Sequence, residues 1–152
     1  MPAEEMFIVR PGESRPTRVP MPGYRVLAGD NDTGMRFSFL EVVVIHDVPP
    51  HIHHRDAESA LVVEGELRFT YQGVDYDAGP GTYIYLPKGV PHSVKRLSKS
   101  NPKVLQVASP GGFEHMAEDL VEAAMKHGAG MDVKNEQFRL IALKYGLEFL
   151  PG

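Results

Sequence analysis

Between residues 35 and 108 the apolar runs are short, and they are separated by glycine, proline, asparagine or aspartate. The runs are rich in valine, tyrosine, phenylalanine and isoleucine, which favour strands. Short strand-like runs with turn signals between them are typical of an antiparallel sandwich or barrel. The runs are MRFSFLEVVVIHD, SALVVEGELRFTYQG, VDYDAGPGTYIYLPKG, HSVKRL and KVLQVAS. The sequence therefore predicts an all-β core over residues 35–112.

The two flanks of this core have different patterns. Residues 1–34 are proline-rich and end in GDNDTG, so we expect an N-terminal arm with one or two short edge strands. Residues 113–152 change to helical spacing and predict a helical tail. The first helix should start near Phe113 and stop at Gly128 or Gly130, and Asp132 or Asn135 should cap a second helix that ends at Gly146. We expect one domain over residues 1–152.

Composition narrows the classes of function. The net charge is −4 with no long run of either sign, which argues against a nucleic-acid partner. There is no cysteine, so a metal site would have to use imidazole and carboxylate ligands. The start MPAEEMFIVR lacks the apolar region of a signal peptide, and no apolar stretch approaches the ~20 residues that span a bilayer. We expect a cytoplasmic protein that does not enter membranes.

Three of the seven histidines lie within four residues, in the stretch PPHIHHRDAE. Alternate side chains of a strand share a face, so His51 and His53 should point to one side and His54 to the other. Glu58 follows after a short loop and precedes the apolar run ALVV. A carboxylate in that position is costly unless it is paired, and a cation bound by His51 and His53 would pair it.

A further histidine lies in GPGTYIYLPKGVPHSVKR. Gly81 should begin a strand, Pro87 should end it, and Gly89 permits a tight turn before His92 begins the next strand. Three neutral imidazoles and one carboxylate suit a divalent transition metal, namely Fe, Mn, Ni, Co, Cu or Zn. The predicted ligands are His51, His53, Glu58 and His92.

These residues resemble the two motifs of the cupin superfamily. The first motif is matched by His51, His53, Glu58 and Gly65, and the second by Gly81, Pro87, Gly89 and His92. Ile45 replaces a glycine that often precedes the first motif, and Arg96 replaces the asparagine of the second. The resemblance implies a single cupin-type β-barrel, a jelly-roll sandwich, with all four metal-ligand positions filled. Because cupins commonly bury sticky sheet edges by pairing two barrels, a homodimer is expected.

A narrower resemblance covers most of the chain. HIHHRDAESALVVEGEL, YLPKGVPHSVK, ASPGGFEHMAEDL and IALKYGLEFLPG look like single-domain cupins related to quercetin 2,3-dioxygenase. In that family a metal held by three histidines and one glutamate binds a flavonol and O₂, and the glutamate, here Glu58, takes the substrate hydroxyl proton. Related cupins are polyketide cyclases, isomerases or decarboxylases. A metal-dependent cyclase or isomerase of a polyketide or small carbonyl compound, and a non-catalytic small-ligand-binding cupin, stay open as alternatives.

The remaining candidates carry weaker signals. Phe37, Phe39, Tyr83 and Arg96 are candidates for the substrate pocket, although core positions are favoured for the aromatic residues. Arg96 shares the strand parity of His92, and we favour its pairing with an acid at the barrel rim over contact with substrate. Surface positions are expected for His46, His54, Asp56, His115 and His127.

Overall fold

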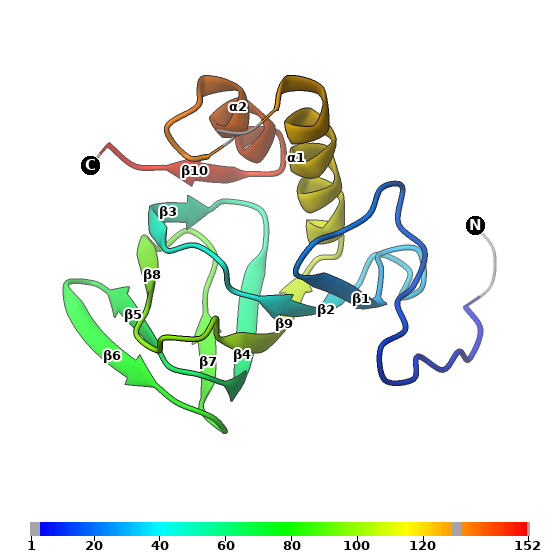
Figure 1. Cartoon of the computed structure of the whole chain (residues 1–152), viewed down its shortest axis with the longest axis horizontal. Helices are drawn as coiled ribbons and strands as arrows, with labels where there is room; N and C mark the ends of the chain where they lie inside the picture. The colour runs from blue at the N-terminus through cyan, green and yellow to red at the C-terminus, as the bar shows by residue number, and fades with distance from the viewer. Residues whose placement is uncertain (1–3, 129–131, 152) are drawn as a thin grey trace.

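The computed structural model describes residues 4–128 and 132–151. Two antiparallel sheets, each of five strands, form a β-sandwich (Figure 1). One sheet has the order β1-β2-β9-β4-β7 and the other the order β10-β3-β8-β5-β6. The strands of the first sheet are β1 (Tyr24–Ala28), β2 (Ser38–Val43), β4 (Ala57–Glu64), β7 (Tyr83–Leu86) and β9 (Lys103–Ser109). Those of the second are β3 (Val48–His53), β5 (Leu67–Tyr71), β6 (Val74–Ala78), β8 (His92–Arg96) and β10 (Leu147–Phe149).

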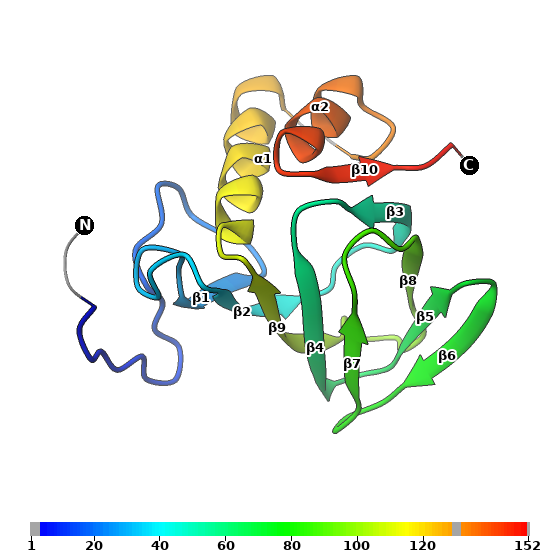
Figure 2. The same cartoon turned by 180° about the vertical axis from the view of Figure 1, so that it is seen from behind.

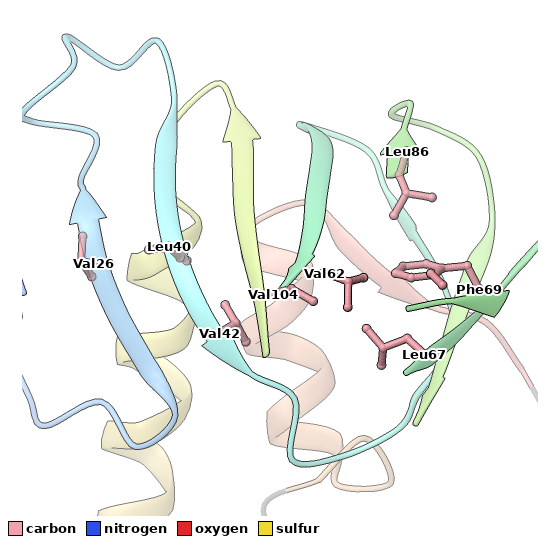
Figure 3. Packing of buried hydrophobic residues seen from close by; sticks show 9 residues of the cluster. Val26, Leu40, Val42, Val62, Leu67, Phe69, Leu86 and Val104 are labelled. Carbon is pink, nitrogen blue, oxygen red and sulfur yellow. The ribbon is translucent and has the colours of Figure 1, made fainter. Parts of the chain in front are cut away.

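Buried and half-buried side chains alternate along the strands, and the buried ones form the core. In β2, Ser38, Leu40 and Val42 are buried while their neighbours are only half-buried. Figure 3 shows side chains from both sheets meeting in the space between them. The expected all-β barrel is therefore confirmed. The buried cluster consists of Val26, Leu40, Val42, Val62, Leu67, Phe69, Ala78, Leu86 and Val104.

Glycine is needed at two of the turns. The β5–β6 hairpin turns at Gln72 and Gly73, whose φ angles of 51° and 77° match the two left-handed residues of a type I′ turn. At Gly65, φ is 75° and an added Cβ would lie 2.9 Å from Cα of Pro102. The chain leaves β4 through this close backbone approach, which only glycine allows.

Helix α1 (Phe113–His127) and helix α2 (Glu136–Lys144) lie together on one side of the sandwich (Figures 1 and 2). Gly128 caps the end of α1, and the alternative stop, Gly130, lies outside the described residues. The Asn135 side chain accepts hydrogen bonds from the N–H groups of Gln137 and Phe138, so Asn135 rather than Asp132 is the N-cap. In the described part of the chain, no helix is long and apolar enough to cross a membrane.

The tail is not only helical, which corrects the sequence-based expectation. After α2 the chain forms β10, which pairs with β3 so that Leu147 lies opposite His53 and Phe149 opposite His51. Three residues are too few to show a strand pattern in the sequence. The strand exists because β3 offers an unpaired edge, and pairing satisfies the backbone groups of both segments.

Candidate metal centre

Two neighbouring strands bring three histidines together. His51 and His53 are on β3, and His92 begins β8, directly opposite His51 in the antiparallel register. All three side chains are buried, with exposures of 3–5%. Their ring centroids are 4.3 Å apart for His51 and His92, 5.0 Å for His51 and His53, and 5.4 Å for His53 and His92. One nitrogen from each ring lies within 4.8 Å of the others, so the group could hold a metal ion.

Backbone carbonyls orient two of the rings. Nδ1 of His51 lies 2.8 Å from the carbonyl oxygen of Pro49, and Nδ1 of His92 lies 3.3 Å from that of Val90. A carbonyl only accepts hydrogen bonds, so each Nδ1 is the protonated nitrogen and each Nε2 keeps its lone pair. This is the arrangement in which a histidine binds a metal through Nε2.

Glu58 approaches the histidines from the opposite sheet. It lies on β4, and its Oε2 is 3.4 Å from Nε2 of His53. Its other oxygen, Oε1, accepts a hydrogen bond of 2.7 Å from the side-chain amide of Gln106 on β9. Gln106 therefore orients the carboxylate and leaves Oε2 directed towards the imidazoles.

The protonation states of the three histidines and of Glu58 are compatible with binding a cation. Burial lowers the pKa of His51 to about 4 and that of His53 to about 3, with further lowering by neighbouring imidazoles. Burial also lowers the pKa of His92, so all three rings are neutral near pH 7. Burial, followed by the charge of Asp56, raises the pKa of Glu58 to about 8. Without a cation Glu58 therefore holds a proton near pH 7, and a divalent ion would displace this proton and pair the carboxylate, so the donor set fits a metal.

Asp56 is buried at 2% exposure, although the sequence places it in an exposed charged loop. Its Oδ2 lies 3.7 Å from Nδ1 of His53 and has no hydrogen-bond partner among the described residues. The turn between β3 and β4 folds this carboxylate in behind the His53 ring. Nothing in the stretch HRDAE distinguishes Asp56 from the exposed residues beside it, so sequence reasoning missed it.

Two aromatic side chains of the tail also reach the histidines. The Phe149 ring on β10 is 5.7 Å from His51, and the Phe113 ring at the start of α1 is 6.3 Å from His53. No sequence pattern predicts that Phe113 and Phe149 contact the histidines, because both residues lie in the C-terminal tail, far along the chain from His51 and His53. Together they provide an apolar wall beside the imidazoles.

The candidate pocket residues lie elsewhere. Tyr83 is 62% exposed and shares the outer face of its sheet with Leu61, opposite to the face of Glu58. Phe39 also faces outward in β2, and half-buried Phe37 precedes that strand. The structure does not bring these three aromatic residues to the histidines.

Arg96 pairs with an acid at the rim, as favoured from the sequence. Its Nε lies 3.3 Å from Oδ1 of exposed Asp47, and one of its terminal nitrogens donates to Asn101. His54 is exposed and lies 3.1 Å from Glu148, which agrees with its expected outward direction. His115 is partly exposed, in keeping with its expected surface position, and both of its ring nitrogens contact carboxylates.

The sequence was compared with protein families and with curated proteins. Residues 39–108, which run from β2 to β9, match the family model described as "Cupin domain", in agreement with a cupin-type fold of the two-sheet sandwich. The chain is 27% identical over 161 aligned residues to quercetin 2,3-dioxygenase of Bacillus subtilis (strain 168), covering 99% of this chain and 46% of that protein. The chain thus spans about half the length of this curated relative.

Solved structures agree on the fold. The polyketide cyclase RemF from Streptomyces resistomycificus superposes with a TM-score of 0.54 at 28% identity, covering 69% of this chain and 80% of that one. KdgF from Halomonas sp. superposes with a TM-score of 0.52 at 19% identity, covering 62% and 84%. The second likeness supports the fold alone.

Proposed function

We propose that this protein is a metal-dependent enzyme that acts with dioxygen on a flavonol, enol or phenolic small molecule. The observation that carries the proposal is the convergence of three neutral imidazoles and the Glu58 carboxylate in one buried site. The proposed ligands are His51, His53, His92 and Glu58, and the ion is Fe, Mn, Ni, Co, Cu or Zn. When bound, such an ion would supply the Lewis-acid and redox chemistry that the side chains lack. The similarity to quercetin 2,3-dioxygenase supports this reaction class.

Glu58 is the proposed general base. Its Oε1 is held by Gln106, so Oε2 is the oxygen that would accept a proton from a phenol or enol hydroxyl. A bound cation would keep this buried carboxyl ionised, and because burial favours the neutral form, the carboxylate would readily take up the substrate proton. The same oxygen would return the proton when the product forms.

The apolar wall would bind the substrate ring. Phe113 and Phe149 stand beside His53 and His51 and would limit the access of water to the imidazoles. Aromatic faces of this kind pack against planar ligands. A flavonol or another planar enol would therefore be oriented with its hydroxyl towards Glu58.

Oxygen uptake tests the proposal. Protein stripped with a chelator should be reconstituted with each candidate metal and screened with flavonols and 1,3-dicarbonyl compounds. We expect oxygen consumption that requires both the metal and the substrate. A fully metallated protein that consumes neither oxygen nor any of these substrates would overturn the dioxygenase assignment.

A second candidate is a metal-dependent cyclase or isomerase of a polyketide or small carbonyl compound. The similarity to the polyketide cyclase RemF favours it. Such a reaction consumes no oxygen, so turnover of a polyketide substrate under nitrogen would select this alternative. A ligand that binds without turnover in either atmosphere would indicate a non-catalytic binding cupin.

A further inference from the structure

A second group of ionisable side chains shares no residue with the histidine cluster. Asp30 follows β1, and Glu114 and His115 lie in the first turn of α1. One donor atom from each lies within 4.8 Å of the others. Nε2 of His115 is 2.9 Å from Oδ2 of Asp30 and 3.7 Å from Oε1 of Glu114. These separations are close to those between neighbouring ligands around one metal ion, given metal–ligand bonds of about 2.0–2.2 Å.

Glu118 fixes the orientation of the imidazole. Its Oε1 lies 2.7 Å from Nδ1 of His115, one helical turn away, so Nδ1 carries a proton and Nε2 faces the other two carboxylates. The second oxygen of Glu118 accepts a hydrogen bond from the backbone N–H of Arg18 in the N-terminal arm. A carboxylate behind a histidine is the arrangement that orients and strengthens a metal-ligating imidazole.

The buried charge is not balanced by protein groups alone. Asp30, Glu114 and Glu118 are 7%, 4% and 3% exposed. Arg18 contacts Glu118, whereas Oε2 of Glu114 is buried and has no hydrogen-bond partner in the described part of the chain. A doubly protonated His115 would satisfy Asp30 and Glu118 but would leave this oxygen of Glu114 unpaired. Oε1 of Glu114, the oxygen nearer to Nε2, already accepts a hydrogen bond of 2.8 Å from the backbone N–H of Asp30. A cation bound between Asp30, Glu114 and His115 would supply the positive charge that a carboxylate with an unpartnered buried oxygen requires.

An ion can reach the group from solvent. A cavity of about 460 Å³ is lined by Arg15, Thr17 and Arg18 of the arm and by Asp30, Glu114 and His115. Figure 1 shows the arm running beside the base of α1. A cavity of this size admits a hydrated ion, and water molecules could complete its coordination shell.

We propose that Asp30, Glu114 and His115 form a second binding site, for a divalent first-row transition cation, with Glu118 as a positioning residue. One imidazole and two carboxylates make a mixed nitrogen and oxygen set, which suits Mn, Fe, Co, Ni or Zn better than Ca or Mg. The bound ion joins the loop after β1 to the start of α1. This proposal is independent of the reaction at the histidine cluster.

Metal stoichiometry tests the second site. Untagged protein should be stripped with a chelator, dialysed against Zn²⁺ alone and analysed for zinc per chain. We expect two ions in the wild type, one in Glu114→Gln and one in the double variant His51→Ala/His53→Ala. The control Glu122→Gln changes a more exposed carboxylate of the same helix and should keep two. One ion in the wild type that Glu114→Gln retains, or two ions in Glu114→Gln, overturns the second site.

Folding of the variants is checked on the same samples. Circular dichroism of stripped Glu114→Gln should match that of the stripped wild type, because the amide keeps the size of the carboxylate. If Glu114→Gln does not fold, Asp30→Asn replaces it with the same expected loss of one zinc ion. Retention of two ions in a folded Asp30→Asn variant overturns the proposal.

A separate variant tests the positioning role. Glu118→Gln should weaken zinc binding at the second site about 10- to 100-fold, the usual effect of removing a carboxylate behind a ligating histidine. Zinc binding at the histidine cluster should not change. Affinities are measured by competition with a chromophoric chelator, in the His51→Ala/His53→Ala background for the second site. An unchanged affinity there would show that Glu118 does not position His115.

Discussion

Asp56 lies directly behind His53, with 3.7 Å between Oδ2 of the carboxylate and Nδ1 of the ring. The carboxylate is buried and its Oδ2 has no hydrogen-bond partner among residues 4–128 and 132–151. Backbone carbonyl oxygens accept hydrogen bonds from Nδ1 of His51 and His92. At His53 the group beside Nδ1 is instead the carboxylate of Asp56. A carboxylate in this position raises the basicity of a ligating imidazole.

We predict that Asp56→Asn lowers the metal affinity of the histidine cluster by about 10- to 100-fold. The amide fills the same volume but removes the charge behind His53. The affinity is measured by chelator competition, and Asp47→Asn, at the exposed rim, is the control that should leave it unchanged. Equal affinities of Asp56→Asn and the wild type would exclude this role.

Metal removal should destabilise the fold. An ion that binds only the native state contributes roughly 3–4 kcal/mol at 100 to 1,000 times its dissociation constant. The melting temperature should therefore fall when a chelator is added. His53→Ala should reduce this drop and remove one metal ion per chain, whereas His54→Ala, on the exposed face, should change neither. The same loss of metal from both variants would mean that the assignment of the two strand faces is wrong.

Glu58→Gln separates the two roles proposed for the carboxylate. The amide keeps one coordinating oxygen but cannot act as a base. If Glu58 takes the substrate proton, the variant should keep much of its metal and lose about 10²-fold or more in turnover. If Glu58 is only a ligand, activity should follow metal occupancy and recover when metal is added. Metal content and rate are measured on the same sample, and wild-type turnover by a fully metallated variant would rule out the base.

We predict a homodimer that forms through the outer face of the sheet that contains β4 and β7. Tyr83, Tyr85, Leu61 and Val63 are 62%, 61%, 39% and 41% exposed and make one apolar patch, with Tyr83 opposite Leu61. Strand β7 also ends its sheet, so a second copy would cover both the patch and a free edge.

Sedimentation at micromolar concentration tests this interface. The wild type should sediment as a dimer and Tyr85→Glu as a monomer, because the new charge would be buried without a partner. Tyr76→Glu changes a tyrosine of similar exposure on β6, at the edge of the other sheet, and should remain dimeric. A monomeric wild type would contradict the prediction.

Asp119 should make stability depend on pH in acid. Burial acts to raise its pKa, but hydrogen bonds from Tyr145, Arg18 and Lys144 outweigh burial and lower it below the ordinary value of 3.8. A group with a lowered folded-state pKa contributes stability above its unfolded pKa and loses it as pH falls through the folded value. The contribution of Asp119 is therefore complete above about pH 5 and decreases progressively below about pH 4, as pH falls towards the lowered folded-state pKa.

Asp119→Asn should lower the free energy of unfolding by about 1–2 kcal/mol at pH 7. The difference from the wild type should shrink as pH falls towards 3, because the wild-type carboxylate is then being protonated. Urea unfolding at pH 3, 4, 5 and 7 measures this, with Glu66→Gln, at an exposed position, as the control. A difference that stays constant over this range would show that the charge of Asp119 does not stabilise the fold.

Features that depend on neighbours along the chain could be predicted from the sequence. Strand alternation placed His51 and His53 on one face and His54 on the other, because successive side chains of a strand point to opposite sides. Gly128 and Asn135 were each one of two predicted helix ends, and both act through backbone groups a few residues away. The cupin motifs indicated the barrel, while the metal-binding role of its histidines and Glu58 stays a prediction.

Other features arose only when distant segments met. Asp56 is buried because the β3–β4 turn folds it behind His53, and Phe149 reaches His51 because β10 pairs with the edge of β3. His115 contacts Asp30 across 85 positions of the chain. No local pattern encodes these contacts, since burial and charge pairing depend on which surfaces the completed fold brings together. Local patterns thus predict most of the strands and the direction of the histidines, whereas packing between distant segments sets which carboxylates and rings surround them, because those contacts form only in the completed fold.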